Sequence, residues 1–149
     1  MEIGSQDGGC RCGQVRFRVS GQPVMTFACH CTGCQRMTAS AFSLSAFYPS
    51  AAFEVLSGEP VIGALHGAHR HFFCPYCMSW IFTRPAGLDQ FVNIRPTMVD
   101  DATSFTPFIE TYTIEKLPWA STPAVYHFER YPPMEEFPRL LAEYATRSE

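Results

Sequence analysis

Alternating hydrophobic and polar residues predict a short strand near the start of the chain. Residues 15–19 read V-R-F-R-V, and a period of two is typical of a strand that buries one face. A Gly-Gln-Pro sequence at 21–23 ends this strand. Comparable short segments, bounded by Pro, Gly, Ser or Asp, occur at 41–47, 53–56, 61–65, 72–73, 80–83, 91–94 and 108–114.

Turn-forming residues interrupt the chain too often for long helices. The 10 Gly and 12 Pro residues separate the strand-like segments at nearly regular intervals, which indicates an all-β domain of short antiparallel strands. One short helix is predicted near the C-terminus, because apolar residues recur every three or four positions between Met134 and Tyr144. Pro138 can begin or kink this helix. No boundary divides the sequence, so residues 1–149 are predicted to form a single domain.

Composition and charge exclude several functional classes. Of the 149 residues, 46% are hydrophobic and the formal net charge is −3, which suits a folded core but not a phosphate backbone. We therefore expect no nucleic-acid partner. No apolar run reaches the roughly 20 residues that span a bilayer, and residues 1–9 lack the basic and apolar order of a signal peptide. We expect no membrane partner and a cytoplasmic location.

Seven cysteines form three groups along the sequence. They are Cys10 and Cys12, then Cys29, Cys31 and Cys34, then Cys74 and Cys77. The odd count and the expected location disfavour a disulfide framework. C-x-C and C-x-x-C spacings instead allow sulfur atoms to converge on one metal ion. Since zinc takes four ligands, seven thiolates predict one saturated, structural site and one three-cysteine site with an open position.

Spacing alone does not decide which cysteines share a site. A zinc ribbon built from two C-x-x-C pairs is one possible partition. It would use Cys31, Cys34, Cys74 and Cys77 and leave Cys10, Cys12 and Cys29 over. The residues themselves leave this choice open.

Three cysteine-containing blocks resemble the signature of a known family. They are G-G-C-R-C-G-Q-V-R-F at 8–17, C-H-C-T-G-C-Q-R at 29–36 and F-C-P-Y-C at 73–77, followed by L-P-W at 117–119. In order and spacing these blocks are similar to the glutathione-dependent formaldehyde-activating enzyme family, also called the CENP-V/GFA domain. The likeness extends from about Gly8 to Phe128.

The resemblance implies a fold, two metal sites and an activity. The implied fold is an Mss4-like β-tent, and the implied cofactors are two zinc ions. The structural zinc is expected on Cys10, Cys12, Cys74 and Cys77, and the catalytic zinc on Cys29, Cys31 and Cys34. The implied partners are a small-molecule thiol and an aldehyde, with glutathione as co-substrate. Adding glutathione to formaldehyde gives S-(hydroxymethyl)glutathione, which makes the enzyme a carbon–sulfur lyase in the reverse direction.

Two positions depart from the family's pattern. Met78 stands after the last cysteine, where the family has a glycine suited to positive φ, so the knuckle geometry is expected to differ there. Thr38-Ala39-Ser40 keeps only the serine of the family's Gly-Ser pair. If that glycine admits substrate, the pocket and the substrate are altered.

Other residues and other functions compete with this interpretation. Arg36 and Arg95 are candidates to clamp a glutathione carboxylate through paired hydrogen bonds, although an arginine exposed to solvent needs no ligand. His30 is expected to turn away from the cysteines and form a hydrogen bond. A non-enzymatic zinc-binding module and a glutathione carrier are the alternative functions.

Overall fold

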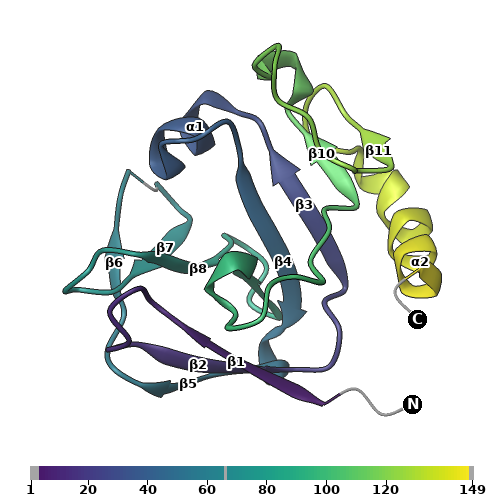
Figure 1. Cartoon of the computed structure of the whole chain (residues 1–149). Helices are drawn as coiled ribbons and strands as arrows, with labels where there is room; N and C mark the ends of the chain where they lie inside the picture. The colour runs from purple at the N-terminus through teal and green to yellow at the C-terminus, as the bar shows by residue number, and fades with distance from the viewer. Residues whose placement is uncertain (1–3, 66, 148–149) are drawn as a thin grey trace. The chain divides into compact units, whose positions relative to one another are not determined.

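The computed structural model describes residues 4–65 and 67–147, and within them the chain forms two compact units (Figure 1). Unit one comprises residues 4–23 and 46–105, and unit two comprises residues 24–45 and 106–147. That the units together form the single domain expected above stays a prediction. Among the described residues, no helix is long and apolar enough to span a membrane.

A three-stranded antiparallel sheet forms one part of unit one. Its order is β1-β2-β5, with β1 at Ser5–Gly9, β2 at Arg16–Ser20 and β5 at Phe53–Ser57. The alternation predicted for residues 15–19 is confirmed, because Val15, Phe17 and Val19 are buried while the two arginines between them are half-buried. These arginines pair with aspartates, Arg16 with Asp100 and Arg18 with Asp7.

Four further strands of unit one pair in the antiparallel order β9-β8-β7-β6. They are β6 at Val61–Gly63, β7 at Arg70–Phe73, β8 at Trp80–Arg84 and β9 at Phe91–Ile94. Strand β4, Ser43–Pro49, contributes its last four residues to this unit by pairing with β9. Two 3₁₀ turns complete the unit, η1 at Ser50–Ala52 and η2 at Pro96–Met98.

The core of unit one is built from aliphatic and aromatic side chains of these strands, together with Cys10 and Cys74. Phe72 stacks on Phe82 with ring centroids 4.6 Å apart, and Phe53 lies 4.8 Å from Phe82. Aromatic contacts at these separations add to the stabilisation from burial. Since two cysteines belong to this core, the residues that position Cys10 and Cys74 also hold the unit together.

Unit two has parallel strand pairs, which the antiparallel prediction did not include. Strand β10, Ile109–Thr111, pairs in parallel with β3, Met25–Cys29, and with β11, Tyr126–His127. No hairpin joins β3 to β10, because the residues of unit one lie between them in the sequence. The link from β10 to β11 contains the 3₁₀ turn η3, Thr113–Glu115, and is long enough for the chain to return in the same direction.

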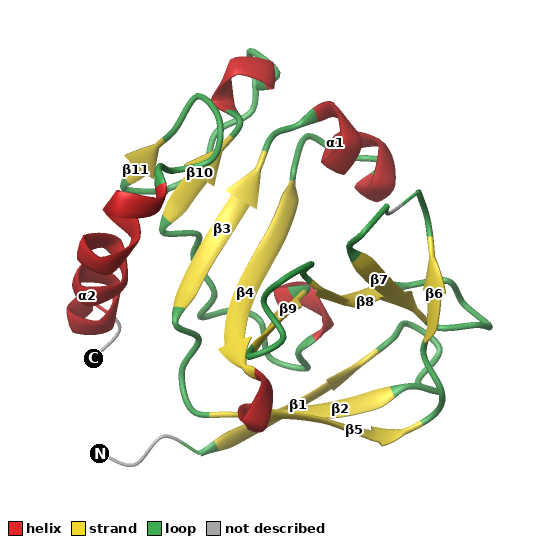
Figure 2. Ribbon diagram, turned by 180° about the vertical axis from the view of Figure 1, so that it is seen from behind, coloured by secondary structure: helices red, strands yellow, loops and turns green. Residues whose placement is uncertain are grey.

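Two α-helices lie in unit two. Helix α2, Phe137–Arg147, follows the 3₁₀ turn η4 at Met134–Glu136 and lies beside β10 and β11 in Figures 1 and 2. Tyr144 of α2 packs its ring 5.4 Å from that of Phe108, and Leu140 is fully buried. The predicted C-terminal helix is therefore confirmed, with Pro138 in its first turn, where proline is tolerated. Helix α1, Thr32–Thr38, was not predicted.

The predicted all-β class and its short C-terminal helix are confirmed, and the parallel pairs of β10 and the seven-residue helix α1 are additions to that prediction.

Candidate functional site

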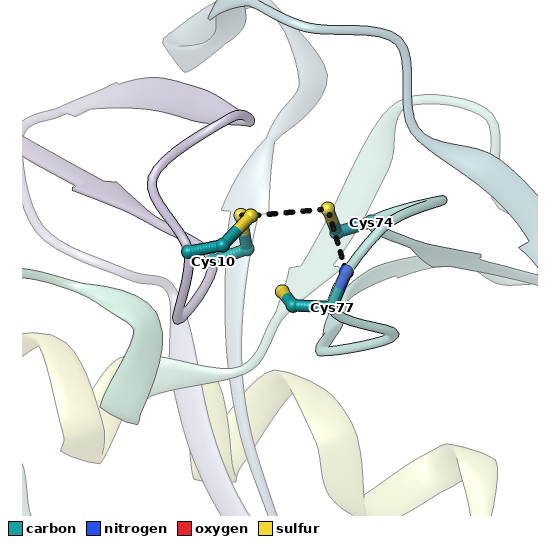
Figure 3. Close-up of side chains that lie close together, drawn as sticks. Cys10, Cys74 and Cys77 are labelled. Atoms are coloured by element: carbon teal, nitrogen blue, oxygen red, sulfur yellow. Dashed lines mark hydrogen bonds between the residues drawn. The ribbon is translucent and has the colours of Figure 1, made fainter.

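The first cysteine group brings together two turns of unit one. Cys10 and Cys12 follow β1, and Cys74 and Cys77 lie between β7 and β8. The Sγ atoms of Cys10 and Cys12 are 3.5 Å apart, and those of Cys12 and Cys74 are 3.7 Å apart. Figure 3 shows Cys10, Cys74 and Cys77 directed toward one another.

These distances fit a metal ion bound by four sulfurs. A regular tetrahedron with zinc–sulfur bonds of about 2.3 Å has sulfur–sulfur edges of about 3.8 Å. All four Sγ atoms lie within 4.8 Å of one another. The group can therefore hold a metal ion, and four thiolates would fill its coordination sphere.

Backbone N–H groups turn toward the sulfur atoms in both turns. Val15 N–H donates to Cys10 Sγ at 3.3 Å, and the N–H groups of Tyr76 and Cys77 donate to Cys74 Sγ at 3.4 and 3.5 Å. Such hydrogen bonds stabilise thiolates. They also help to fix the directions of the Cys10 and Cys74 side chains.

Met78 has a backbone conformation that favours glycine. Its φ is +60°, and its N–H donates to the carbonyl oxygen of Cys74 at 3.0 Å. The turn after Cys77 therefore has a backbone that a glycine would suit. That its geometry differs from the family's knuckle stays a prediction. An L-residue with positive φ is strained, so this turn stores a small energetic cost.

The sulfurs of the first group do not ionise alike. A hydrogen bond from the Ser79 hydroxyl lowers the pKa of Cys77 to about 5. The N–H of Gln14 lowers the pKa of Cys12, but burial and the neighbouring sulfurs outweigh it and raise that pKa to about 11. Four sulfurs at this spacing repel one another as thiolates unless a cation lies among them, which is a further reason to expect a metal ion.

The second cysteine group is formed within unit two by one short stretch of chain. Cys29 ends β3, Cys31 is the N-cap of α1, and Cys34 lies in the first turn of α1. Their three Sγ atoms lie within 4.8 Å of one another. No fourth Cys, His, Asp or Glu ligand atom joins this group among the described residues. The group can hold a metal ion and leave one coordination position for another molecule.

The three sulfurs of this trio differ in pKa. Hydrogen bonds from the thiols of Cys29 and Cys34 lower the pKa of Cys31 to about 2. The pKa values of Cys29 and Cys34 are raised in turn by their interactions with neighbouring sulfurs. Cys34 N–H also donates to Cys31 Sγ at 3.3 Å. Cys31 is therefore the sulfur of the trio that becomes a thiolate most readily.

Ala39, one of the residues that depart from the family's pattern, has a backbone conformation that favours glycine. It ends α1 with φ +52°, and its N–H donates to the carbonyl oxygen of Gln35. Glycine is the residue best suited to a left-handed helix end, so the geometry of α1 accounts for a glycine at this position. Whether the change also alters substrate entry stays a prediction.

His30 forms a hydrogen bond, as predicted, and is also buried. Its side chain is 0% exposed and its Nε2 lies 2.8 Å from Glu110 Oε1. Sequence reasoning did not identify Glu110. The available signal was a charged residue at the centre of an apolar strand, F-I-E-T at 108–111, since carboxylates are almost never fully buried without partners.

The two candidate arginines lie in different surroundings. Arg36 is exposed on α1, in the unit that holds the three-cysteine group. Arg95 is buried in unit one, and its guanidinium carbon lies 4.0 Å from the centroid of the Trp80 ring, a cation–π contact. The role of either arginine in binding a carboxylate stays a prediction.

The family model for glutathione-dependent formaldehyde-activating enzymes matches residues 5–115 of the chain. The chain belongs to this family. The match includes all seven cysteines, and the structure groups them as the resemblance implied, with Cys74 and Cys77 beside Cys10 and Cys12 in one group and the other three cysteines in a second. The zinc-ribbon partition is therefore wrong. All seven are free of disulfides.

A solved structure supports the fold of this family member. A protein of Rhodobacter sphaeroides, determined as a structural genomics target, matches with a TM-score of 0.52 and 17% sequence identity. The match covers 63% of this chain and 87% of that protein. At this identity the likeness bears on the fold alone.

Proposed function

We propose that the chain is a zinc-dependent carbon–sulfur lyase that forms or cleaves the adduct of glutathione, or a similar thiol, with formaldehyde or another small aldehyde. The observation that carries this proposal is the second cysteine group, in which three sulfurs converge and no fourth protein ligand joins them among the described residues. Membership of the glutathione-dependent formaldehyde-activating enzyme family supports the choice of thiol and aldehyde.

The two cysteine groups have different proposed roles. Cys10, Cys12, Cys74 and Cys77 would hold a structural zinc, because four thiolates leave no position for substrate. Cys29, Cys31 and Cys34 would hold the catalytic zinc, and they are the proposed catalytic residues. Bound there, zinc supplies a soft cation that stabilises an incoming thiol as its thiolate beside the aldehyde.

The proposed reaction requires few catalytic groups besides the three cysteines. The thiol S–H bond breaks, a bond forms between sulfur and the carbonyl carbon, and the carbonyl oxygen takes up a proton, without any change in oxidation state. Thiols and aldehydes also combine without a catalyst, so alignment accounts for much of the required acceleration. Arg36, exposed on the same helix as Cys34, is placed in this proposal to bind a glutathione carboxylate.

Nuclear magnetic resonance exchange measurements test the proposal. The rate of exchange between formaldehyde, glutathione and their adduct is measured with wild type, with Cys31→Ser and with Ser57→Ala as a control. Ser57 is exposed on β5 in unit one, so its variant is expected to keep the wild-type rate. Cys31→Ser is expected to fall to the uncatalysed rate. Equal rates for wild type and Cys31→Ser would instead leave a binding module or a glutathione carrier.

A further inference from the structure

A fully buried carboxylate lies at the centre of unit two. Glu110, on β10, is 0% exposed. The hydroxyl of Thr122 donates to its Oε1 at 2.9 Å, and the same oxygen lies 2.8 Å from His30 Nε2. The Oε2 atom of Glu110 is hydrogen-bonded to His127 Nδ1, and Lys116 Nζ lies 3.9 Å from Oε1. Both oxygens therefore have partners.

These partners keep the carboxylate charged. Burial raises the pKa of Glu110, but the hydrogen bonds from His30, His127 and Thr122 outweigh burial and leave that pKa below its ordinary value. A buried ion pair is a poor source of stability, because apolar side chains of similar volume often stabilise a fold as well. The more specific effect of this network is the geometry that it imposes on His30.

His30 is fixed on several sides. The backbone N–H of His30 donates to the carbonyl oxygen of Thr111 at 3.0 Å, and the backbone carbonyl oxygen of His30 accepts from Gln35 Nε2 at 2.8 Å. Its ring lies edge-on to Phe42 with centroids 5.3 Å apart. The bond to Glu110 is the polar contact that sets the orientation of the ring, because no partner of Nδ1 is found among the described residues.

The position of His30 determines the positions of two sulfurs. His30 is covalently joined to Cys29 on one side and to Cys31 on the other, so a rotation of its backbone would move both sulfurs relative to Cys34. Thr32 N–H is held in addition by Glu115 Oε1 at 2.7 Å. The loop that carries the three-cysteine group is thus fixed by contacts from residues 110–115, about 80 positions away in sequence.

We propose that Glu110 is a positioning residue for the three-cysteine site, acting through its hydrogen bond to His30 to hold the Cys29 and Cys31 sulfurs in a metal-binding arrangement. The inference rests on the proposed function in taking this trio as a metal site. It goes beyond that function by assigning the preorganisation of the site to a residue outside the cysteine motif.

Three variants separate positioning from charge and from general packing. Glu110→Ala removes the contact to His30. Glu110→Gln keeps it, because an amide oxygen can accept from His30 and Thr122 while its NH₂ donates to a neutral His127 Nδ1. His127→Ala is the matched control, since it contacts the other oxygen of the same carboxylate and its own side chain is 53% exposed.

The readout is cobalt binding, measured by the sulfur-to-cobalt charge-transfer absorption. The absorption due to the three-cysteine site is obtained by subtracting, for each variant, the absorption of the same variant carrying Cys31→Ser in addition. Glu110→Ala is expected to weaken cobalt binding at this site by about tenfold or more, the usual effect of removing a residue that supports metal ligands. Glu110→Gln and His127→Ala are expected to stay within about threefold of wild type. If Glu110→Ala fails to fold, His30→Phe removes the same bond and is expected to give the same loss.

Several results would overturn the inference. Wild-type affinity and absorption in Glu110→Ala would show that the site does not depend on this contact. An equal loss in His127→Ala would indicate general packing, and an equal loss in Glu110→Gln would indicate charge. Each of these leaves the proposed function standing. Absence of cobalt from the trio in wild type would overturn the proposed function together with this inference.

Discussion

Replacing Ala39 with glycine is expected to stabilise the chain. Ala39 ends α1, which carries Cys34, and its φ of +52° is in the left-handed region. The alanine side chain is exposed, so removing its methyl group loses little burial. The N–H groups of both Ala39 and Ser40 donate to the carbonyl oxygen of Gln35, and glycine would keep these bonds.

The magnitude follows from two opposing contributions. An L-residue in the left-handed region costs about 1–2 kcal/mol. Glycine has more freedom in the unfolded chain, which costs about 0.4–1 kcal/mol. The net expectation for Ala39→Gly is a gain of roughly 0.5–1 kcal/mol in the free energy of unfolding. For a chain of this length that gain corresponds to a rise in Tm of about 1–4 °C.

Urea denaturation at a fixed excess of zinc measures this change. The control is Ser40→Gly, because Ser40 is also exposed but is not among the described residues with positive φ. This control is expected to lose about 0.5 kcal/mol, the usual cost of added glycine freedom. A loss of stability in Ala39→Gly, or the same change in both variants, would refute the reasoning.

Three further predictions concern the two cysteine groups and their surroundings. Cys74→Ser is expected to unfold the chain at 25 °C, because structural zinc contributes about 10 kcal/mol or more to folding and Cys74 is fully buried. Cys31→Ser is expected to keep the circular dichroism spectrum of wild type. The same spectrum from both variants would contradict the division of the two cysteine groups into structural and catalytic sites. Glu110→Gln is expected to be less stable than wild type near pH 7 by on the order of 1 kcal/mol, the advantage of a charged hydrogen bond. The pKa of the folded carboxyl lies below its ordinary value of 4.5, so wild type loses this advantage as the pH falls below 4.5. Urea denaturation at several pH values measures the difference in stability between the two proteins, and a difference that stays constant below pH 4.5 would contradict this prediction. Arg36→Gln is expected to raise the KM for glutathione by about tenfold with kcat unchanged, as for loss of one ion pair in the ground state; steady-state kinetics showing no change in KM would remove Arg36 from the site.

The features that sequence could predict are those recorded by local patterns. The alternation at 15–19 corresponds to β2, and the short apolar segments at 53–56 and 80–83 correspond to β5 and β8. The C-terminal helix was predictable because its apolar spacing extends over three turns. The division of the cysteines was predictable only through the family's blocks, since spacing alone allowed two partitions.

Other features depend on contacts that no local pattern records. Strand β1 reads S-Q-D-G-G, without apolar alternation, and is held by its pairing with β2. Helix α1 has seven residues and no buried side chain, so it has no apolar face to detect. The parallel pairing of β10 and the burial of Glu110 both depend on partners about 80 residues away. The grouping of the cysteines was therefore predictable, and the contacts that hold the three-cysteine loop were not.

Counting zinc in freshly purified protein tests the central claim most directly. Wild type is expected to contain close to two zinc ions per chain, and Cys31→Ser close to one, with the remaining ion held by the four-cysteine group. One ion in wild type that is unaffected by Cys31→Ser would show that the three-cysteine group binds no metal. That result would contradict the proposed chemistry.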